Sequence, residues 1–143
     1  MLTVKTSELN LVTTTNDALG HRVNVQFPIN KHAGASESGV VYFEIAPGDK
    51  LATHTDSQEE VLYIVAGECE AHCGDEVCTL QAGDLAVIPA MIPHGVTKVI
   101  GDETLKVVGF FAGSTIVSTF DEPLEPVGQR ILEQAPVPAP VPA

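Results

Sequence analysis

Four side chains suited to metal binding or acid–base chemistry stand close together in this sequence. His54 and Asp56 are separated by one residue within a predicted strand, so their side chains leave the same face of a sheet. Glu60 opens the next apolar strand, and the three groups converge if these two strands pair as a hairpin. His94 opens a later strand, directly after the rigid corner 89–93. Two imidazoles with one or two carboxylates are typical ligands of a first-row transition metal that keeps open coordination positions.

The same residues also allow plainer interpretations. A histidine near a strand end can be a satisfied or exposed residue, and Asp56, Glu59 and Glu60 can form an ordinary acidic loop. Without a metal, the clustered histidines and carboxylates would share a hydrogen-bonded proton network. The spacing alone leaves these alternatives open.

A second group of candidate ligands surrounds His72. Cys69, Cys73 and Cys78 lack the CxxC hook of structural zinc sites, and strand alternation directs His72 away from the first two cysteines. We interpret these cysteines as small buried residues of a hairpin. An odd number of cysteines in one short stretch also argues against a disulfide framework and favours a reducing compartment.

Short apolar or β-branched runs that end at turn residues supply the elements that position these side chains. The predicted strands are 39–45, 51–55, 61–65, 69–73, 77–80, 85–88, 94–100, 105–111 and 115–120. Frequent turn signals with almost no helical period predict an all-β antiparallel sandwich or barrel. Helix is expected only at 7–11 and 127–134, and the remaining histidines, His21 and His32, are expected to be exposed.

Three of these strands contain segments that are apolar on both faces, namely 40–45, 61–65 and 106–111. A strand of this kind needs a cover on its outer face as well as on its inner face. A second copy of the chain is the economical cover, so we expect a homodimer.

Composition limits the classes of partner. The 143 residues favour one domain, and 7 Lys plus Arg against 19 Asp plus Glu give a net charge of −12. Nucleic acid and membranes are therefore not expected as partners. No apolar run is long enough for a membrane span, and the N-terminus lacks the pattern of a secretory signal, so we expect a soluble, cytoplasmic protein.

Two ordered motifs make the chain resemble the cupin superfamily, especially small bacterial single-domain cupins that are quercetin-dioxygenase-like. The first motif spans 48–67, with Asp56 where a second histidine is usual. The second spans 83–98, with Met91 in place of the usual glycine and Lys98 in place of the usual asparagine. Residues that match in register are Gly48, His54, Glu60, Gly67, Gly83, Pro89 and His94.

The resemblance implies a jelly-roll barrel with a metal inside. Residues 39–120 would form the barrel, 1–38 an N-terminal arm with strands that pack on it, 121–134 a C-terminal extension, and 135–143 a disordered Pro-rich tail. Carried over by position, the metal ligands are His54, Asp56, Glu60 and His94. Two carboxylates balance a divalent cation, and this set favours Fe(II), Ni(II) or Mn(II), with Zn(II) also accommodated.

The implied function is that of a metal-dependent oxidoreductase. A small oxygen-bearing substrate, such as a diketone, enol or hydroxy acid, would bind the metal and be cleaved with O2 in a dioxygenase-type reaction. An isomerase or lyase that works through an enolate, with Glu60 or Glu59 moving the proton, needs the same site. A noncatalytic cupin that binds a small ligand or a metal is the alternative from another class.

Overall fold

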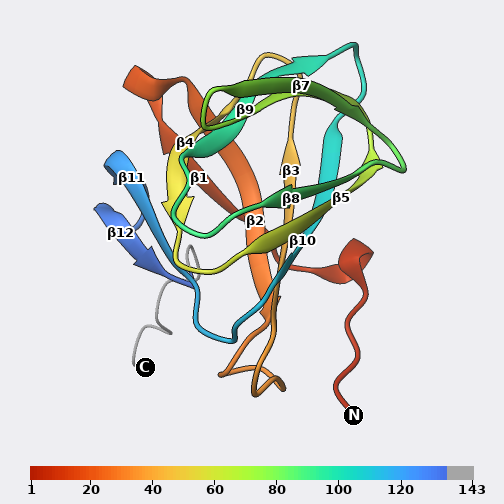
Figure 1. Cartoon of the computed structure of the whole chain (residues 1–143), viewed down its shortest axis with the longest axis vertical. Helices are drawn as coiled ribbons and strands as arrows, with labels where there is room; N and C mark the ends of the chain where they lie inside the picture. The colour runs from red at the N-terminus through yellow and green to blue at the C-terminus, as the bar shows by residue number, and fades with distance from the viewer. Residues whose placement is uncertain (135–143) are drawn as a thin grey trace.

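Two six-stranded sheets face each other and enclose the interior of the molecule (Figure 1). The computed structural model describes residues 1–134. The first sheet has the order β1-β2-β3-β10-β5-β8 and the second β12-β11-β4-β9-β6-β7. Neighbouring strands pair antiparallel throughout both sheets. The predicted all-β antiparallel jelly-roll barrel is confirmed.

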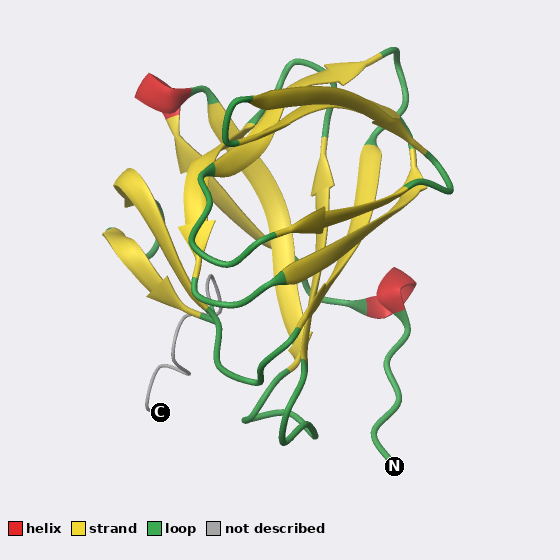
Figure 2. Ribbon diagram, viewed as in Figure 1, coloured by secondary structure: helices red, strands yellow, loops and turns green. Residues whose placement is uncertain are grey.

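Within residues 1–134, strands account for nearly all of the regular structure, and the helical elements are two single 3-10 turns (Figure 2). In chain order the elements are η1 Thr6–Glu8, β1 Val12–Asn16, η2 Asp17–Leu19, β2 His21–Ile29, β3 Gly39–Ile45, β4 Leu51–Asp56, β5 Glu60–Ala66, β6 Glu68–Cys73, β7 Glu76–Gln81, β8 Leu85–Ile88, β9 His94–Ile100, β10 Leu105–Phe111, β11 Val117–Leu124 and β12 Gln129–Glu133.

The core lies between the two sheets and is built by strand alternation. On β2, for example, every second side chain from His21 to Phe27 is buried, while the intervening ones are more exposed. Strands β3, β5, β10, β6 and β9 add further apolar side chains to the same cluster. This burial supplies the main driving force for closing the two sheets on each other.

Terminal segments extend both sheets. β1 and β2, from the segment expected to be an arm, join the first sheet beside β3. The helix expected at 127–134 is wrong, because β12 occupies this segment and pairs with β11. Leu132 of β12 is buried while Ile131 is exposed, which is the alternation of a strand. The helix expected at 7–11 is replaced by the short turn η1.

β4 and β5 do not pair as a hairpin, which was the condition given for the convergence of His54, Asp56 and Glu60. β4 pairs with β9 and β11 in the second sheet, whereas β5 pairs with β8 and β10 in the first. The segment 57–59 carries the chain across, held by bonds from Ser57 N to Val117 O and from Ala112 N to Glu59 O. The two strands therefore face each other across the barrel, and their inward side chains meet in its interior.

The outer face of the first sheet is apolar across β5, β8 and β10. Five large side chains on it are 40–67% exposed: Tyr63, Val65, Leu85, Val87 and Phe110. Their register places Tyr63 beside Leu85 and Val108, and Phe110 beside Val61. We call these five residues the outer apolar face.

The Pro-rich tail expected at 135–143 lies outside the described residues. Within 1–134, no helix is long and apolar enough to cross a membrane.

Candidate metal centre

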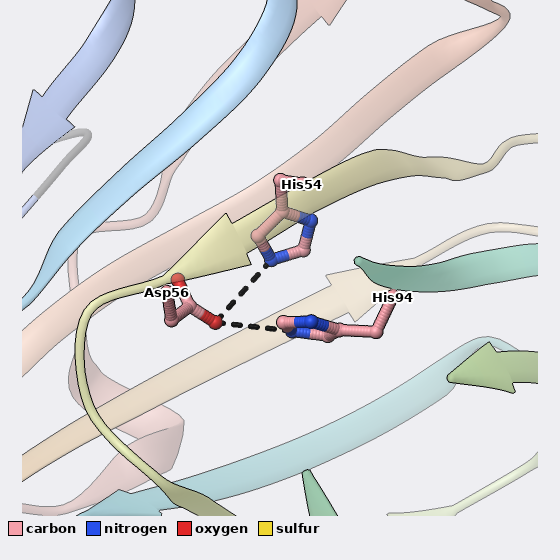
Figure 3. Close-up of side chains that lie close together, drawn as sticks. All are labelled: His54, Asp56 and His94. Carbon is pink, nitrogen blue, oxygen red and sulfur yellow. Dashed lines mark ion pairs between the residues drawn. The ribbon is translucent and has the colours of Figure 1, made fainter. Parts of the chain in front are cut away.

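Three of the four predicted metal ligands meet inside the barrel. His54 and Asp56 leave the same face of β4, and His94, the first residue of β9, lies directly opposite His54 in the strand pair. Figure 3 shows the two imidazoles and the carboxylate pointing toward one another. All three side chains are buried, and one ligand atom of each lies within 4.8 Å of the others. Among residues 1–134 this trio is the group with metal-ligating geometry.

Backbone carbonyls fix the tautomer of both imidazoles. His54 Nδ1 lies 2.8 Å from Ala52 O, and His94 Nδ1 lies 2.9 Å from Ile92 O. Because a carbonyl oxygen can only accept, each Nδ1 carries a hydrogen and donates it. In the neutral imidazole, Nε2 is then the lone-pair atom, and both Nε2 atoms face Asp56. Metal-binding histidines are commonly oriented by such a hydrogen bond from one ring nitrogen, which leaves the other nitrogen free to bind the metal.

These lone pairs meet carboxylate oxygens, which are acceptors as well. Asp56 Oδ2 lies 3.0 Å from His94 Nε2 and 3.5 Å from His54 Nε2. His94 Nε2 is buried and has no hydrogen-bond partner. Acceptors at these separations need a cation between them, either a metal ion or a proton. Two ligand atoms of one metal ion stand roughly 3.0 to 3.4 Å apart, and the separations of 3.0 and 3.5 Å from Asp56 Oδ2 are close to this range.

Glu60 reaches the trio from the opposite sheet. It is the first residue of β5, it is buried, and its Oε1 lies 3.7 Å from His94 Nε2. Gly109 of β10 makes room for this carboxylate, because a Cβ at that position would overlap Glu60 Oε2. The structure therefore brings together all four predicted residues, which we call the inner cluster: His54, Asp56, Glu60 and His94.

The two carboxyl groups of the inner cluster have opposite electrostatic settings. Burial acts to raise the pKa of Asp56, but hydrogen bonds and positive charge from His54 and His94, which they supply when protonated at Nε2, outweigh burial and hold that pKa well below its usual range. Burial, with the negative charge of Asp56 added, raises the pKa of Glu60 well above its usual range. Asp56 is therefore the permanent anion, and Glu60 is the group that can hold a proton.

Two side chains of β11 support the inner cluster, and sequence reasoning missed both. The Ser118 hydroxyl donates to Asp56 Oδ1 at 2.6 Å, which leaves Oδ2 directed at the imidazoles. The Phe120 ring stacks on His54, with ring centres 4.6 Å apart. The pairing of β11 with β4 places them there, Ser118 opposite Asp56 and Phe120 opposite His54. Sequence spacing holds no signal for this pairing.

His21 is a further supporting residue, and its expected exposure is wrong. It is 2% exposed, accepts at Nδ1 from Ala52 N at 3.0 Å and contacts Thr14 Oγ1 through Nε2 at 2.9 Å. The Ala52 peptide thus connects His21 to His54, whose Nδ1–H bonds the carbonyl of the same residue. The apolar alternation that follows His21 in β2 was the available signal for its burial. His32 is exposed, as expected.

Met91 shows why its position usually carries glycine in the second motif. Its φ of 63° lies in the left-handed region, which costs a side chain other than glycine some strain. The conformation lets Met91 N donate to Asp56 O at 2.8 Å. The corner before β9 is thereby tied to the strand that carries Asp56.

The other candidates lie outside the inner cluster. Glu59 has an exposed side chain that does not line the cavity described below. The expectation of buried cysteines is confirmed for Cys69 but wrong for Cys78, which is exposed on the edge strand β7. His72 bonds the Thr53 hydroxyl at 2.9 Å instead of a cysteine.

A cavity of about 660 Å³ leads to the inner cluster. Its walls are largely apolar, and β8, with Pro89 and Ile92 of the following corner, contributes one side. This volume lies in the range of sites for small organic ligands, roughly 300 to 1,000 Å³. The arrangement offers a buried polar centre at the end of an apolar chamber.

Comparisons with known proteins agree with the fold. Residues 41–111 match the family model described as the Cupin domain. A solved structure from Klebsiella pneumoniae with a double-stranded β-helix domain is 26% identical, with a TM-score of 0.58, over 67% of this chain and 81% of that chain. The oxalate decarboxylase of Bacillus subtilis, a protein with Mn(II) centres, is 20% identical with a TM-score of 0.61, over 70% of this chain and 28% of its own.

A sequence relative with a named activity matches a shorter stretch. The 3-hydroxyanthranilate 3,4-dioxygenase of Bacillus thuringiensis is 34% identical over 58 residues, which is 37% of this chain and 32% of the relative. The chain thus spans about a third of the length of the curated relatives it matches.

The buried His21 makes stability depend on pH. Burial and the nearby His54 lower the pKa of His21 to about 4, whereas the unfolded chain titrates it near 6.5. The stabilising contribution is therefore complete above pH 6.5 and is lost as pH falls toward 4. Between pH 7.5 and 4.5 we expect His21 to account for up to about 2.5 kcal/mol of lost unfolding free energy in the metal-free protein.

Urea denaturation of the wild type and His21→Gln at both pH values measures this contribution. The substitution should flatten the pH dependence, while His32→Gln, at an exposed histidine, should leave it unchanged. A pH dependence in His21→Gln as steep as in the wild type would contradict the assignment.

Proposed function

This chain belongs to the cupin superfamily, and from that premise we propose that its inner cluster binds a divalent transition metal used in dioxygenase-type cleavage of a small oxygen-bearing substrate. The observation that carries the proposal is the buried His94 Nε2, which has no hydrogen-bond partner and faces carboxylate oxygens of Asp56 and Glu60. A cation bound by all of them would satisfy every one of these acceptors.

The donor set fits a divalent metal. Two neutral imidazoles and two carboxylates bring two negative charges, which equal the charge of the cation, and oxygen donors favour Fe(II), Ni(II) or Mn(II) over softer ions. The Mn(II) centres of the structurally similar oxalate decarboxylase support this choice. Zn(II) is also compatible with the set.

Each part of the site has a defined task in the proposed reaction. The bound metal would act as a Lewis acid and, if redox-active, provide the route for O2 chemistry. The Ala52 and Ile92 carbonyls hold the imidazoles in the ligating tautomer, and Ser118 orients Asp56. Glu60 takes the acidic proton of the substrate at its carboxylate. Both atoms of O2 enter the cleaved product, with the substrate as the reductant.

An isomerase or lyase is the second candidate, and the setting of Glu60 favours it. A carboxyl group whose pKa is raised by burial can return the proton it has taken, which moves hydrogen without consuming O2. The name of the Bacillus relative supports the dioxygenase instead, since that protein acts with O2 on an aromatic ring. Oxygen consumption separates the two candidates.

The Fe(II)-loaded protein is expected to consume O2 with at least one member of a panel of diketones, catechols, aminophenols and flavonols, one O2 per substrate. Glu60→Gln keeps the shape of the site but removes both the base and one anionic ligand, so at equal metal content it should lower the rate about 100-fold or more. Glu59→Gln is the matched control at the adjacent, exposed carboxylate and should retain the wild-type rate.

Substrate turnover without O2 uptake would replace the dioxygenase by the isomerase or lyase. Binding without turnover of any panel member would leave the noncatalytic cupin as the function.

We also propose that the outer apolar face pairs two copies of the chain. Its five side chains form a continuous apolar surface over three neighbouring strands, and such a surface is more stable when covered. Two residues of the outer apolar face, Leu85 and Val87, also line the cavity, so the proposed homodimer would border it.

Light scattering after size-exclusion chromatography tests the dimer. The wild type should have twice the chain mass, and Phe110→Glu should shift it to the monomer because a charge would be buried in the interface. Val77→Glu, at a more exposed apolar residue of β7 in the other sheet, should remain dimeric. A monomeric wild type, or an unaffected Phe110→Glu, would refute the proposed interface.

A further inference from the structure

The charges that line the cavity are all of one sign. Asp56 and Glu60 of the inner cluster line it, and so does Glu76 of the edge strand β7. None of the seven Lys and Arg residues, all of which fall within residues 1–134, lines the cavity. A ligand in the cavity therefore meets no Lys or Arg side chain.

Strand register places Glu76 in line with the metal-facing histidines. His54 pairs with His94, His94 with Cys73, and Cys73 with Glu76, so the four residues form one row across the second sheet. With neighbouring strands about 4.8 Å apart, Glu76 stands roughly 10 Å from His94 at the backbone. Glu76 is exposed and lines the cavity, so it adds a negative charge to the cavity wall outside the inner cluster.

Charge balance inside the cavity disfavours an additional anion. The proposed metal is already neutralised by Asp56 and Glu60, so a carboxylate elsewhere on the ligand would be buried without a counter-ion. Such a group is paired with Arg or Lys in proteins because its desolvation is costly. The net charge of −12 adds a repulsive field for anions approaching the cavity.

The remaining walls suit a neutral, apolar ligand body. Phe27, Phe43, Ile64, Val107 and Phe111 line the cavity from the first sheet. Burial of an apolar ring against them is favourable, and two adjacent oxygen or nitrogen atoms would suffice to reach the metal.

From this charge pattern, and resting on the proposed metal centre, we infer that the site takes neutral chelating substrates with an apolar body, such as aminophenols, catechols or diketones, and rejects those that carry a free carboxylate. The Bacillus dioxygenase and the oxalate decarboxylase are both named for carboxylate compounds. The specificity inferred for this chain therefore differs from both.

One pair of compounds isolates the effect of the ligand's carboxylate on binding. 2-Aminophenol is 3-hydroxyanthranilate without its carboxyl group, so the two share the same amino and hydroxyl donors. We would load the full-length protein with Co(II) and follow its visible absorption bands during anaerobic titration with each compound, a readout that needs no turnover. 2-Aminophenol should bind at least about tenfold more tightly than 3-hydroxyanthranilate.

A charge substitution tests whether the cavity wall causes this preference. Glu76→Lys removes an anion and adds a cation at the cavity, so it should reduce the discrimination against the acid by about threefold or more. Asp75→Lys makes the same change in net charge at the adjacent turn residue, which does not line the cavity, and should leave the ratio within about twofold of the wild type.

The outcomes distinguish a failure of the inferred specificity from a failure of the proposed metal centre. Equal or tighter binding of 3-hydroxyanthranilate by the wild type overturns the inference, as does an equal effect of both lysine variants. If Co(II) binds but 2-aminophenol leaves its spectrum unchanged, the inference also fails while the metal centre stands. If Co(II) itself does not bind, the proposed function fails and the inference fails with it.

Discussion

Burial of nitrogen lone pairs against carboxylate oxygens is the constraint on which the site depends. His54 and His94 each commit their only N–H to a backbone carbonyl, so the atoms they turn toward Asp56 and Glu60 are acceptors that face acceptors. Water is excluded from His94 Nε2, and no protein donor replaces it. The arrangement is stable when a cation occupies the space between these atoms.

The surrounding structure holds this cluster in place from several sides. The Ala52 peptide bonds His21 through its N–H and His54 through its carbonyl, and Ser118 and Phe120 of β11 position Asp56 and His54. These contacts join strands of both sheets around one point. They pre-orient the ligands, so metal binding would need little rearrangement.

The sequence predicted those features that depend on residues close to one another in the chain. The bounds of strands such as Gly39–Ile45 and His94–Ile100 follow from apolar runs bounded by turn residues. The resemblance to the cupin motifs predicted all four residues of the inner cluster. Contacts between distant strands could not be predicted in this way. The pairing of β4 with β9 and β11, and hence the roles of Ser118 and Phe120, depends on how the whole barrel closes.

Two further predictions, for segment 127–134 and for His21, were wrong because of the residues in those segments themselves. Segment 127–134 mixes charged and apolar residues without a clear period, and its pairing with β11 decides that it is a strand. His21 begins a strand whose inward positions are otherwise apolar. Its two hydrogen bonds offset the free-energy cost of burying the imidazole. Met91 adopts a left-handed conformation that its residue type alone would not indicate.

Calorimetric titration of metal-free protein with Mn(II) or Co(II) tests the central claim most directly. One ion per chain should bind to the wild type and to His32→Ala, while His94→Ala should lose about 100-fold or more in affinity. Asp56→His should keep or raise the affinity, because imidazole is a competent ligand at that position. Wild-type affinity in His94→Ala, or no binding to the wild type, would show that the buried acceptors are joined by a proton and not by a metal.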